Sequence, residues 1–182
     1  GNSLNREQQP VAQVSWQQAA AFCNWLSRRE GMTPFYLEDR GIIVGHDPRS
    51  LGYRLPTEAE WAWVARVKGE ELVRFTWGEE FPPREVKENV ADNSSAYVTG
   101  RILNGYDDGY VVSAPVGSFE ANHRGIFDLG GNVSEWVHDV YTIPASSGVV
   151  ATDPLGAQRG DNYTIRGASW ALGRLPELRL TY

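Results

Sequence analysis

Most of the chain beyond Gly69 has neither helical nor strand periodicity, and this feature restricts the possible folds more than any other. Residues 75–100, FTWGEEFPPREVKENVADNSSAYVTG, read as turn and loop, and only YVVSAPVGSF (110–119) and YTIRGASW (163–170) are strand candidates. Long loops in a compact domain usually need more than an apolar core to hold them, and bound cations are a common solution. Seven tryptophans and 19 glycines agree with this, because glycines bend the backbone and large rings fill an irregular core.

A first helix is predicted in SWQQAAAFCNWLSRREG, residues 15–31. Ser15 and Gln18 have the spacing of a capping box, in which each side chain bonds the backbone N–H of the other residue. Gly31 stands where a left-handed C-terminal cap is expected. Four residues at helical spacing form the expected buried face, namely Trp16, Ala19, Cys23 and Leu26.

A second helix is predicted in RLPTEAEWAWVARVKG, residues 54–69. Thr57 is the expected N-cap, Glu60 is its capping-box partner and Gly69 is the terminator. Glu58 and Glu60 also complement the positive end of the helix dipole. We therefore interpret these two acids as parts of a helix cap and not as catalytic groups.

Length and charge exclude several classes of protein. A chain of 182 residues suits a single domain over residues 1–182, and its formal charge of -6 argues against a nucleic-acid partner, which would need a basic surface. The sequence has no run of about 18 apolar residues, so no membrane span is predicted. Its one cysteine, Cys23, cannot form an internal disulfide, so cysteine content neither indicates nor excludes secretion.

Eight motifs follow one another along the chain: PVAQVSWQQAAAFCNWLS, YRLPTEAEWAWVAR, TWGEEFPP, ENVAD, DDGY, APVGSF, IFDLGGNVSEWVHDVY and IRGASW. In this order they resemble the formylglycine-generating enzyme family, also called the sulfatase-modifying-factor domain, over nearly the whole chain. The resemblance implies an α+β fold, a C-type-lectin-like variant with two helices, small twisted sheets and many loops. This expectation agrees with the two helices and the loop-rich remainder inferred from the residues.

The segment DLGGNVSEWVHDVY, residues 128–141, allows three interpretations from its residues alone: a phosphate cradle, a metal loop, or a tight turn before a buried aromatic ring. A phosphate cradle is disfavoured because no lysine follows the glycines. The family resemblance implies a calcium loop, and calcium takes roughly 6–8 oxygen ligands from carboxylates and carbonyls. The implied ligands are the carboxylates of Asp128 and Glu135 and the carbonyls of Gly131 and Val133.

The resemblance also implies a first calcium loop elsewhere in the chain. Asn89 and Val90 in ENVAD would be completed by Asp108 and Tyr110 in DDGY. The first residue of each pair would give a side-chain oxygen and the second a backbone oxygen. From the residues alone, ordinary Asx turns are the alternative. Calcium is the one cofactor that the resemblance leads us to expect.

Copper chemistry is not expected. Sulfatase-activating members of the family hold a copper ion with two cysteines just beyond the segment that corresponds to RGASW, and Leu172 and Glu177 occupy those positions here. Neither side chain is a soft thiolate, which copper(I) requires. Cys23 is interpreted as a small apolar filler on the buried side of the first helix. We therefore predict no catalytic residues and no formylglycine-generating activity.

Some family relatives contribute to non-haem iron oxidations in which histidines matter. The chain has three histidines, His46, His123 and His138, and none belongs to an HxxxH or HxxH pair. His138 and Asp139 are adjacent and would point apart on a helix. An iron site would need groups far apart in the sequence to converge, so iron is disfavoured as a cofactor.

A binding role remains. Lectin-like folds present their C-terminal loops as a ligand surface, and Trp170, Arg174 and Arg179 are the candidates here, because aromatic rings and guanidinium groups make strong anchors. The ligand would be an unknown small molecule or protein. The alternative is a terminal strand with its flanking loop, formed by Leu172, Leu175, Leu178 and Leu180.

Relative to the family pattern, the chain is expected to be incomplete at both ends. A GxFxMG-like segment before the first motif and a GFR-like strand after the last motif are absent, and Tyr182 would end the chain within a strand. Open sheet edges would then pair with the rest of a longer chain. Weak calcium loops suit the millimolar calcium outside the cytoplasm, which favours an extracytoplasmic location.

The leading hypothesis is a catalytically degenerate member of this family that acts as a calcium-stabilised binding or structural module. The alternative is a metal-dependent oxidoreductase of the non-haem iron type. In that case histidine or carboxylate groups would hold the metal in place of the cysteines. The metal content of the purified protein distinguishes the two hypotheses.

Overall fold

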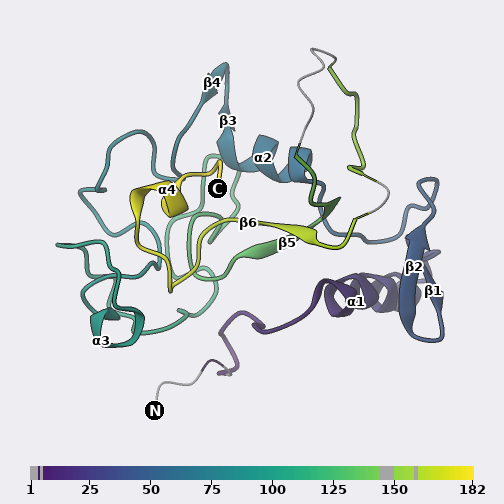
Figure 1. Ribbon diagram of the computed structural model, residues 1–182, viewed down its shortest axis with the longest axis horizontal. Helices are drawn as coiled ribbons and strands as arrows, with labels where there is room; N and C mark the ends of the chain where they lie inside the picture. Colours follow the sequence, from purple (N-terminus) through teal and green to yellow (C-terminus); the bar gives the residue numbers. More distant parts are fainter. Residues whose placement is uncertain (1–3, 5, 144–149, 158–159) are drawn as a thin grey trace. The chain divides into compact units, whose positions relative to one another are not determined.

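A computed structural model describes residues 4, 6–143, 150–157 and 160–182. These residues form four helices and three two-stranded sheets, so the fold is mixed α+β as predicted (Figure 1). The chain divides into two compact units. Unit 1 comprises residues 1–12, 60–135 and 165–182, and unit 2 comprises residues 13–59 and 136–164. The single domain expected over residues 1–182 stays a prediction.

Helix α1 (Trp16–Arg29) in unit 2 begins as predicted. The Ser15 hydroxyl accepts a hydrogen bond from the N–H of Gln18 at 3.2 Å, and the Gln18 side chain accepts one from the N–H of Ser15 at 2.8 Å. Gly31 follows the helix with a φ of 72°. This reciprocal capping confirms the predicted start of the helix.

The buried face of α1 is more polar than predicted. Its fully buried residues are Trp16, Ala20, Asn24 and Ser27. Of the predicted set only Trp16 belongs to it, and the other three residues are half-buried. Asn24 is tolerated because its amide nitrogen donates to the Tyr36 carbonyl at 2.9 Å and its oxygen accepts from the Tyr36 N–H at 3.1 Å. Burying an amide whose two polar atoms are both hydrogen-bonded costs little free energy. The spacing of apolar residues does not take such a polar residue into account, so it predicted the wrong buried face.

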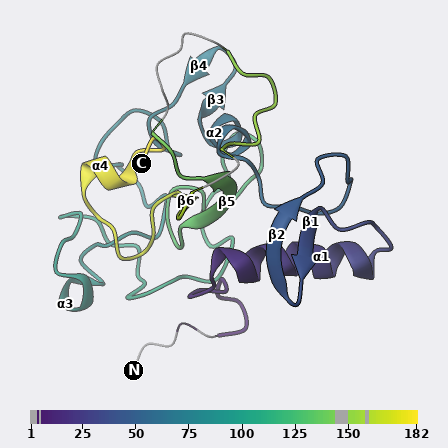
Figure 2. The same cartoon turned by 45° about the vertical axis from the view of Figure 1, so that its right-hand side comes forward.

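A hairpin of β1 (Tyr36–Asp39) and β2 (Ile42–His46) lies against α1 in unit 2 (Figure 2). The pairing is antiparallel, with a register shift between Leu37 and Glu38. Together the helix and the hairpin supply the apolar core of unit 2. This core contains Trp16, Ala20, Phe35, Tyr36 and Ile43, with Cys23, Leu55, Trp136 and Tyr163 packed against it.

Helix α2 (Glu58–Arg66) ends three residues before the predicted terminator. The two residues of β3 (Val67–Lys68) instead pair with β4 (Glu71–Leu72) in a small antiparallel hairpin. Gly69 lies in the turn of this hairpin with a φ of 63°, so its role as a helix terminator was wrong. The capping roles of Thr57 and Glu60 stay predictions.

Only one of the two predicted strands is present. The sequence YTIR forms β6 (Tyr163–Arg166), which pairs with β5 (Glu135–Val140), whereas residues 110–119, all of them described, form turns and loop. His138 and Asp139 therefore lie on a strand and not on a helix. Their side chains still point to opposite faces, because successive strand residues alternate.

The C-terminal segment forms a short helix, so the terminal strand suggested for the leucines is wrong. Helix α4 (Leu175–Leu178) and helix α3 (Ala96–Thr99), each of four residues, are additions to the two predicted helices. Tyr182 lies outside any strand. The core of unit 1 contains Phe75, Val90, Leu103, Tyr106, Ala168 and Leu178. None of the described helices has the length and apolar character to cross a membrane.

Candidate functional site

The second predicted calcium loop, residues 128–135, lies within unit 1 and carries all four predicted ligands of that site. Asp128 begins the loop with a φ of 62°, which is uncommon for a residue other than glycine. Three carboxylate oxygens are buried and lack a hydrogen-bond partner in the described part of the chain: Oδ1 of Asp128, Oε2 of Glu135 and Oε2 of Glu88. Buried oxygens of this kind are costly, and a bound cation removes the cost.

The electrostatics of this loop also favour a cation. Burial raises the pKa of Glu88 to about 7; a hydrogen bond from the Thr76 hydroxyl opposes this, and the charge of Asp128 adds to it. Burial also raises the pKa of Glu135, and the charges of Glu88 and Asp128 raise it further. Because these acids repel one another in a buried site, a positive ion among them would favour their ionised forms.

Glu88 belongs to this site although no sequence pattern singles it out. Its side chain is 3% exposed, and its Oε1 accepts a hydrogen bond from the Thr76 hydroxyl at 2.6 Å. The one signal in the sequence is its position directly before Asn89, the first residue of the other predicted loop. A carboxylate there becomes informative only when the fold brings it next to residues 128–135.

Two glycines allow the chain to approach the predicted ligands closely. A Cβ atom on Gly131 would lie 2.4 Å from the carbonyl oxygen of Asn89. A Cβ atom on Gly167, which has a φ of 76°, would lie 2.5 Å from Oε2 of Glu135. Glycine is therefore required at both positions by packing, and at Gly167 by backbone conformation as well.

The first predicted loop also brings its four residues together within unit 1. The Asp108 carboxylate accepts hydrogen bonds from the N–H groups of Val90 at 2.9 Å and Tyr110 at 2.8 Å. Burial raises the pKa of Asp108 to about 7; those two backbone bonds oppose the shift, and the charge of Asp92 adds to it. Oδ1 of Asn89 is buried and has no hydrogen-bond partner among the described residues. The four residues fit a cation site, with Asn89 offering an oxygen that the protein itself leaves unbonded.

Asn132 joins the two predicted loops to a third segment of unit 1. Its backbone N–H donates to the carbonyl of Asn89. Its side chain, 1% exposed, exchanges two hydrogen bonds with the backbone of Ala114, one from the Ala114 N–H at 3.0 Å and one to the Ala114 carbonyl at 3.2 Å. Asn132 has a φ of 65°, a region that asparagine tolerates better than most residues. One residue thus fixes three loop segments relative to one another.

The three predicted ligand-binding residues have different surroundings. The Nε of Arg174 donates to Oε1 of Glu177 at 2.6 Å, so this guanidinium is held in an ion pair with a buried carboxylate. The backbone N–H of Trp170 donates to the carbonyl of Asn132 at 2.9 Å. Arg179 is exposed and lines a cavity of unit 1. Of the three, Arg179 has the side chain best placed for a ligand, and the binding role stays a prediction.

A copper site does not fit the positions that the resemblance assigns to it. Leu172 packs against the core of unit 1, and Glu177 is 6% exposed and paired with Arg174. Cys23 is half-buried against the core of unit 2, where burial raises the pKa of its thiol. Since the chain has one cysteine, its own residues cannot form a copper site with two thiolates.

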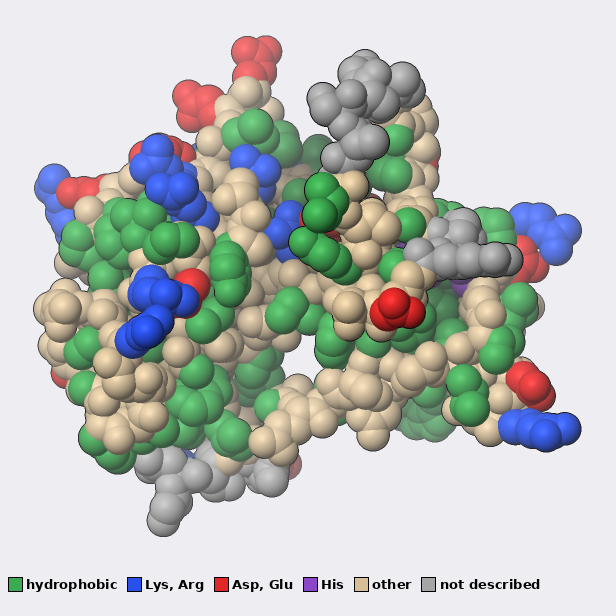
Figure 3. Space-filling view, viewed as in Figure 1, with side chains coloured by type: hydrophobic (Ala, Val, Ile, Leu, Met, Phe, Trp, Pro, Cys, Tyr) green, Lys and Arg blue, Asp and Glu red, His purple; other side chains and the backbone are tan. Residues whose placement is uncertain are grey.

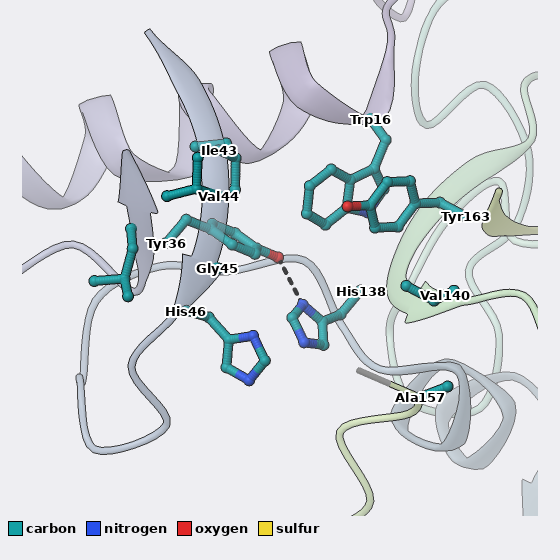
Figure 4. Close-up of a pocket in the computed structure, with 11 residues that line it drawn as sticks. Trp16, Tyr36, Ile43, Val44, Gly45, His46, His138, Val140, Ala157 and Tyr163 are labelled. Carbon is teal, nitrogen blue, oxygen red and sulfur yellow. Dashed lines mark hydrogen bonds between the residues drawn. The ribbon is translucent and has the colours of Figure 1, made fainter. Parts of the chain in front are cut away.

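A cavity of about 310 Å³ in unit 2 brings together two of the three histidines (Figure 4). The Tyr36 hydroxyl lies 3.1 Å from Nδ1 of His138, and the ring centroids of His138 and His46 are 4.8 Å apart with the rings nearly perpendicular. Trp16 and Tyr163 stack on each other along the same cavity with their centroids 3.6 Å apart. Two of the three histidines, distant in the sequence, therefore do converge in the fold, while the expectation that iron is not a cofactor stays a prediction.

His123 is not part of this cavity. It belongs to unit 1, where its Nε2 lies 2.7 Å from the carbonyl oxygen of Val67. Across residues 4, 6–143, 150–157 and 160–182, no group of three or more His, Cys, Asp or Glu side chains is arranged to hold a metal ion. The predicted calcium loops are a different kind of site, because half of their predicted ligands are backbone carbonyl oxygens.

Comparisons with known proteins agree with the motif order. The profile of the sulfatase-modifying factor enzyme 1-like domain matches residues 2–180. The formylglycine-generating enzyme of Thermomonospora curvata is 31% identical over 176 residues, which cover 93% of this chain and 48% of that enzyme. The inactive C-alpha-formylglycine-generating enzyme 2 of Mus musculus is 31% identical over 166 residues, which cover 88% of this chain and 37% of that protein.

A solved structure has the same fold. Treponema denticola variable protein 1 superposes with a TM-score of 0.68 at 27% identity, over 96% of this chain and 64% of that one. The chain spans less than half the length of the two curated relatives named above.

Proposed function

The chain belongs to the sulfatase-modifying factor enzyme 1-like domain family, and on that premise we propose that it is a catalytically degenerate member that works as a calcium-stabilised binding or structural module. Its ligand would be a small molecule or a protein. An extracytoplasmic location is part of the proposal, because the calcium concentration there suits weak loop sites.

The observation that carries this proposal is the nature of the side chains at the two copper positions. Leu172 contributes to the packing of a core, and Glu177 holds Arg174. Both are structural roles, and neither side chain can supply a thiolate. The similarity to a mouse protein whose name describes an inactive enzyme supports the same conclusion by analogy.

Calcium is supported by the unbonded oxygens of the two loops. Asp128 and Glu135, with the carbonyls of Gly131 and Val133, would serve the second loop, and Glu88 would add negative charge beside them. Asn89 and Asp108, with the carbonyls of Val90 and Tyr110, would serve the first. A bound calcium ion would supply positive charge to buried acids that otherwise repel one another, and it would stabilise loops that contain little regular structure. Its function here would be structural.

Metal analysis of the purified protein tests the proposal. We expect stoichiometric calcium without copper or iron, and a lower melting temperature in the presence of a chelator, because an ion that binds only the folded state stabilises it by mass action. The double variant Asp128→Ala/Glu135→Ala should lose the part of the response to the chelator that the second loop supplies. Bound copper or iron together with oxygen consumption would overturn the proposal.

The alternative function, a metal-dependent oxidoreductase, draws support from the convergence of His46 and His138 beside the Tyr36 hydroxyl. We rank it second because this cavity offers two imidazoles and no third His, Cys, Asp or Glu side chain among the described residues. The same metal analysis separates the two functions. Bound iron that is lost in His46→Ala and kept in His123→Ala would favour the alternative.

A further inference from the structure

A second cavity, of about 330 Å³ and lying in unit 1, is lined by three arginines from three separate segments. Arg66 is the last residue of α2, Arg74 follows β4, and Arg179 follows α4. Lys and Arg side chains are visible on the face over α4, β3 and β4 in Figure 3. The chain as a whole carries a net charge of -6, so the positive charge of this cavity is opposite in sign to that of the chain.

Backbone hydrogen bonds hold these three segments together. The N–H of Val73, the residue before Arg74, donates to the carbonyl of Arg66 at 2.9 Å. The N–H of Leu180, the residue after Arg179, donates to the carbonyl of Arg74 at 3.0 Å. The fold therefore fixes the backbone positions of the three arginines relative to one another before any ligand arrives, which lowers the entropic cost of binding.

The positive charge in this cavity is only partly compensated. Glu79 is the one acidic residue lining it; its carboxylate lies 3.6 Å from Nε of Arg74 and accepts a hydrogen bond from the Arg74 backbone N–H at 2.7 Å. Nε of Arg66 is buried without a hydrogen-bond partner, and within the described part of the chain neither Arg66 nor Arg179 has an ion-pair partner. A buried, unbonded guanidinium N–H is costly unless an acceptor fills the space in front of it.

We propose that this cavity binds a phosphate group, either as free phosphate or as a phosphate monoester. Guanidinium groups donate paired N–H bonds to phosphate oxygens, and Thr181, which also lines the cavity, adds a hydroxyl that can donate or accept. The volume exceeds that of a single anion and leaves space for the organic part of an ester. This inference deepens the binding role proposed above and does not require calcium.

Isothermal titration of the full chain with inorganic phosphate and with phenyl phosphate, in a phosphate-free buffer, tests this proposal. We expect saturable binding of at least one of the two, and sodium chloride at the same ionic strength should not reproduce it. Arg179→Ala should weaken binding by about ten-fold or more, because it removes charge-assisted hydrogen bonds. Tighter binding of phenyl phosphate than of inorganic phosphate would identify the ester as the preferred form.

Arg84→Ala is the matched control, because Arg84 is a highly exposed arginine of unit 1 that pairs with Glu80, outside the cavity. Since Arg179 is exposed, Arg179→Ala should leave the fold intact. Arg66→Gln is a second test of the site, to be used once thermal unfolding shows that this variant is folded. Binding that chloride reproduces, or that Arg179→Ala retains in full, would overturn the proposal. The titration is repeated with and without a chelator to separate this result from the calcium test. If the protein shows no stabilisation by calcium but still binds phosphate, the calcium proposal fails and the phosphate site is supported.

Discussion

The backbone N–H of Asn132 donates to the carbonyl oxygen of Asn89 at 2.8 Å, so the two predicted calcium loops share a direct hydrogen bond. Each residue belongs to one loop, and the two are distant in the sequence. The buried Asn132 side chain adds two bonds to Ala114. This one residue therefore couples the loops mechanically, whether or not ions occupy them.

Asn132→Ala should lower the free energy of unfolding by about 2–4 kcal/mol, because it leaves two buried backbone groups of Ala114 unbonded and places alanine at a positive φ. Urea unfolding measures the loss. Asn93→Ala is the control, since Asn93 is exposed and its backbone N–H, which the substitution keeps, donates to the carbonyl of Tyr106. Equal stability of the two variants would contradict the bridging role of Asn132.

The sequence predicts those structural features that depend on residues close together along the chain. The Ser15–Gln18 capping box and the start of α1 follow from residues three positions apart. The missing strand at 110–119 had the right residues for a strand, but its backbone bonds go elsewhere: Val116 bonds Gln8, and Ser113 bonds the Gln9 side chain. Those partners are distant in sequence, so no local pattern reveals them.

The candidate site shows the same division. Family motifs are enough to place Asp128 and Glu135 in one loop, because the motif is continuous. Glu88 and the pairing of His46 with His138 come from segments that meet only in the folded chain. The polar buried face of α1 likewise depends on the position of the Tyr36 backbone, which apolar spacing does not encode.

Stability should depend on pH through Glu88 when calcium is removed. Its pKa is about 7 in the folded protein and about 4.3 when unfolded, so the folded state binds the proton more tightly. The resulting stabilisation is fully present below about pH 4 and is lost as the pH rises through 7, by about 4 kcal/mol at most. Urea unfolding of calcium-depleted protein across this range measures the slope.

Calcium should flatten this pH dependence, because it favours the ionised carboxylate. Glu88→Gln, which cannot titrate, should reduce the slope without calcium but not abolish it, because the raised pKa values of Glu135 and Asp108 contribute with the same sign. A parent protein that becomes more stable between pH 5 and pH 7 in the absence of calcium would have the opposite sign and would refute the assignment to Glu88.

The capping box of α1 predicts a smaller, local effect. Ser15→Ala removes the acceptor for the Gln18 N–H and should cost about 1 kcal/mol of stability. Ser15→Asp keeps an acceptor at the helix start and should restore most of the loss. Thermal unfolding of the three proteins side by side tests this, and an aspartate variant as unstable as the alanine variant would count against the cap.

Gly167 offers the sharpest test of the second loop, because its missing Cβ leaves room for Glu135. Gly167→Ala places a Cβ 2.5 Å from Oε2 of Glu135 at a φ of 76°. Gly105 has almost the same φ, 77°, and a Cβ there meets nothing within 4 Å. Gly105→Ala should therefore cost only the backbone strain, about 1–2 kcal/mol, and keep the stabilisation by calcium.

Gly167→Ala should cost more than this control, because the new methyl group displaces the Glu135 carboxylate as well as straining the backbone. It should also weaken the rise in melting temperature on adding calcium, since a displaced Glu135 carboxylate no longer serves as a ligand of the second loop. Differential scanning fluorimetry of both variants across a calcium titration gives the comparison. If the two alanine variants respond to calcium alike, Glu135 is not a calcium ligand.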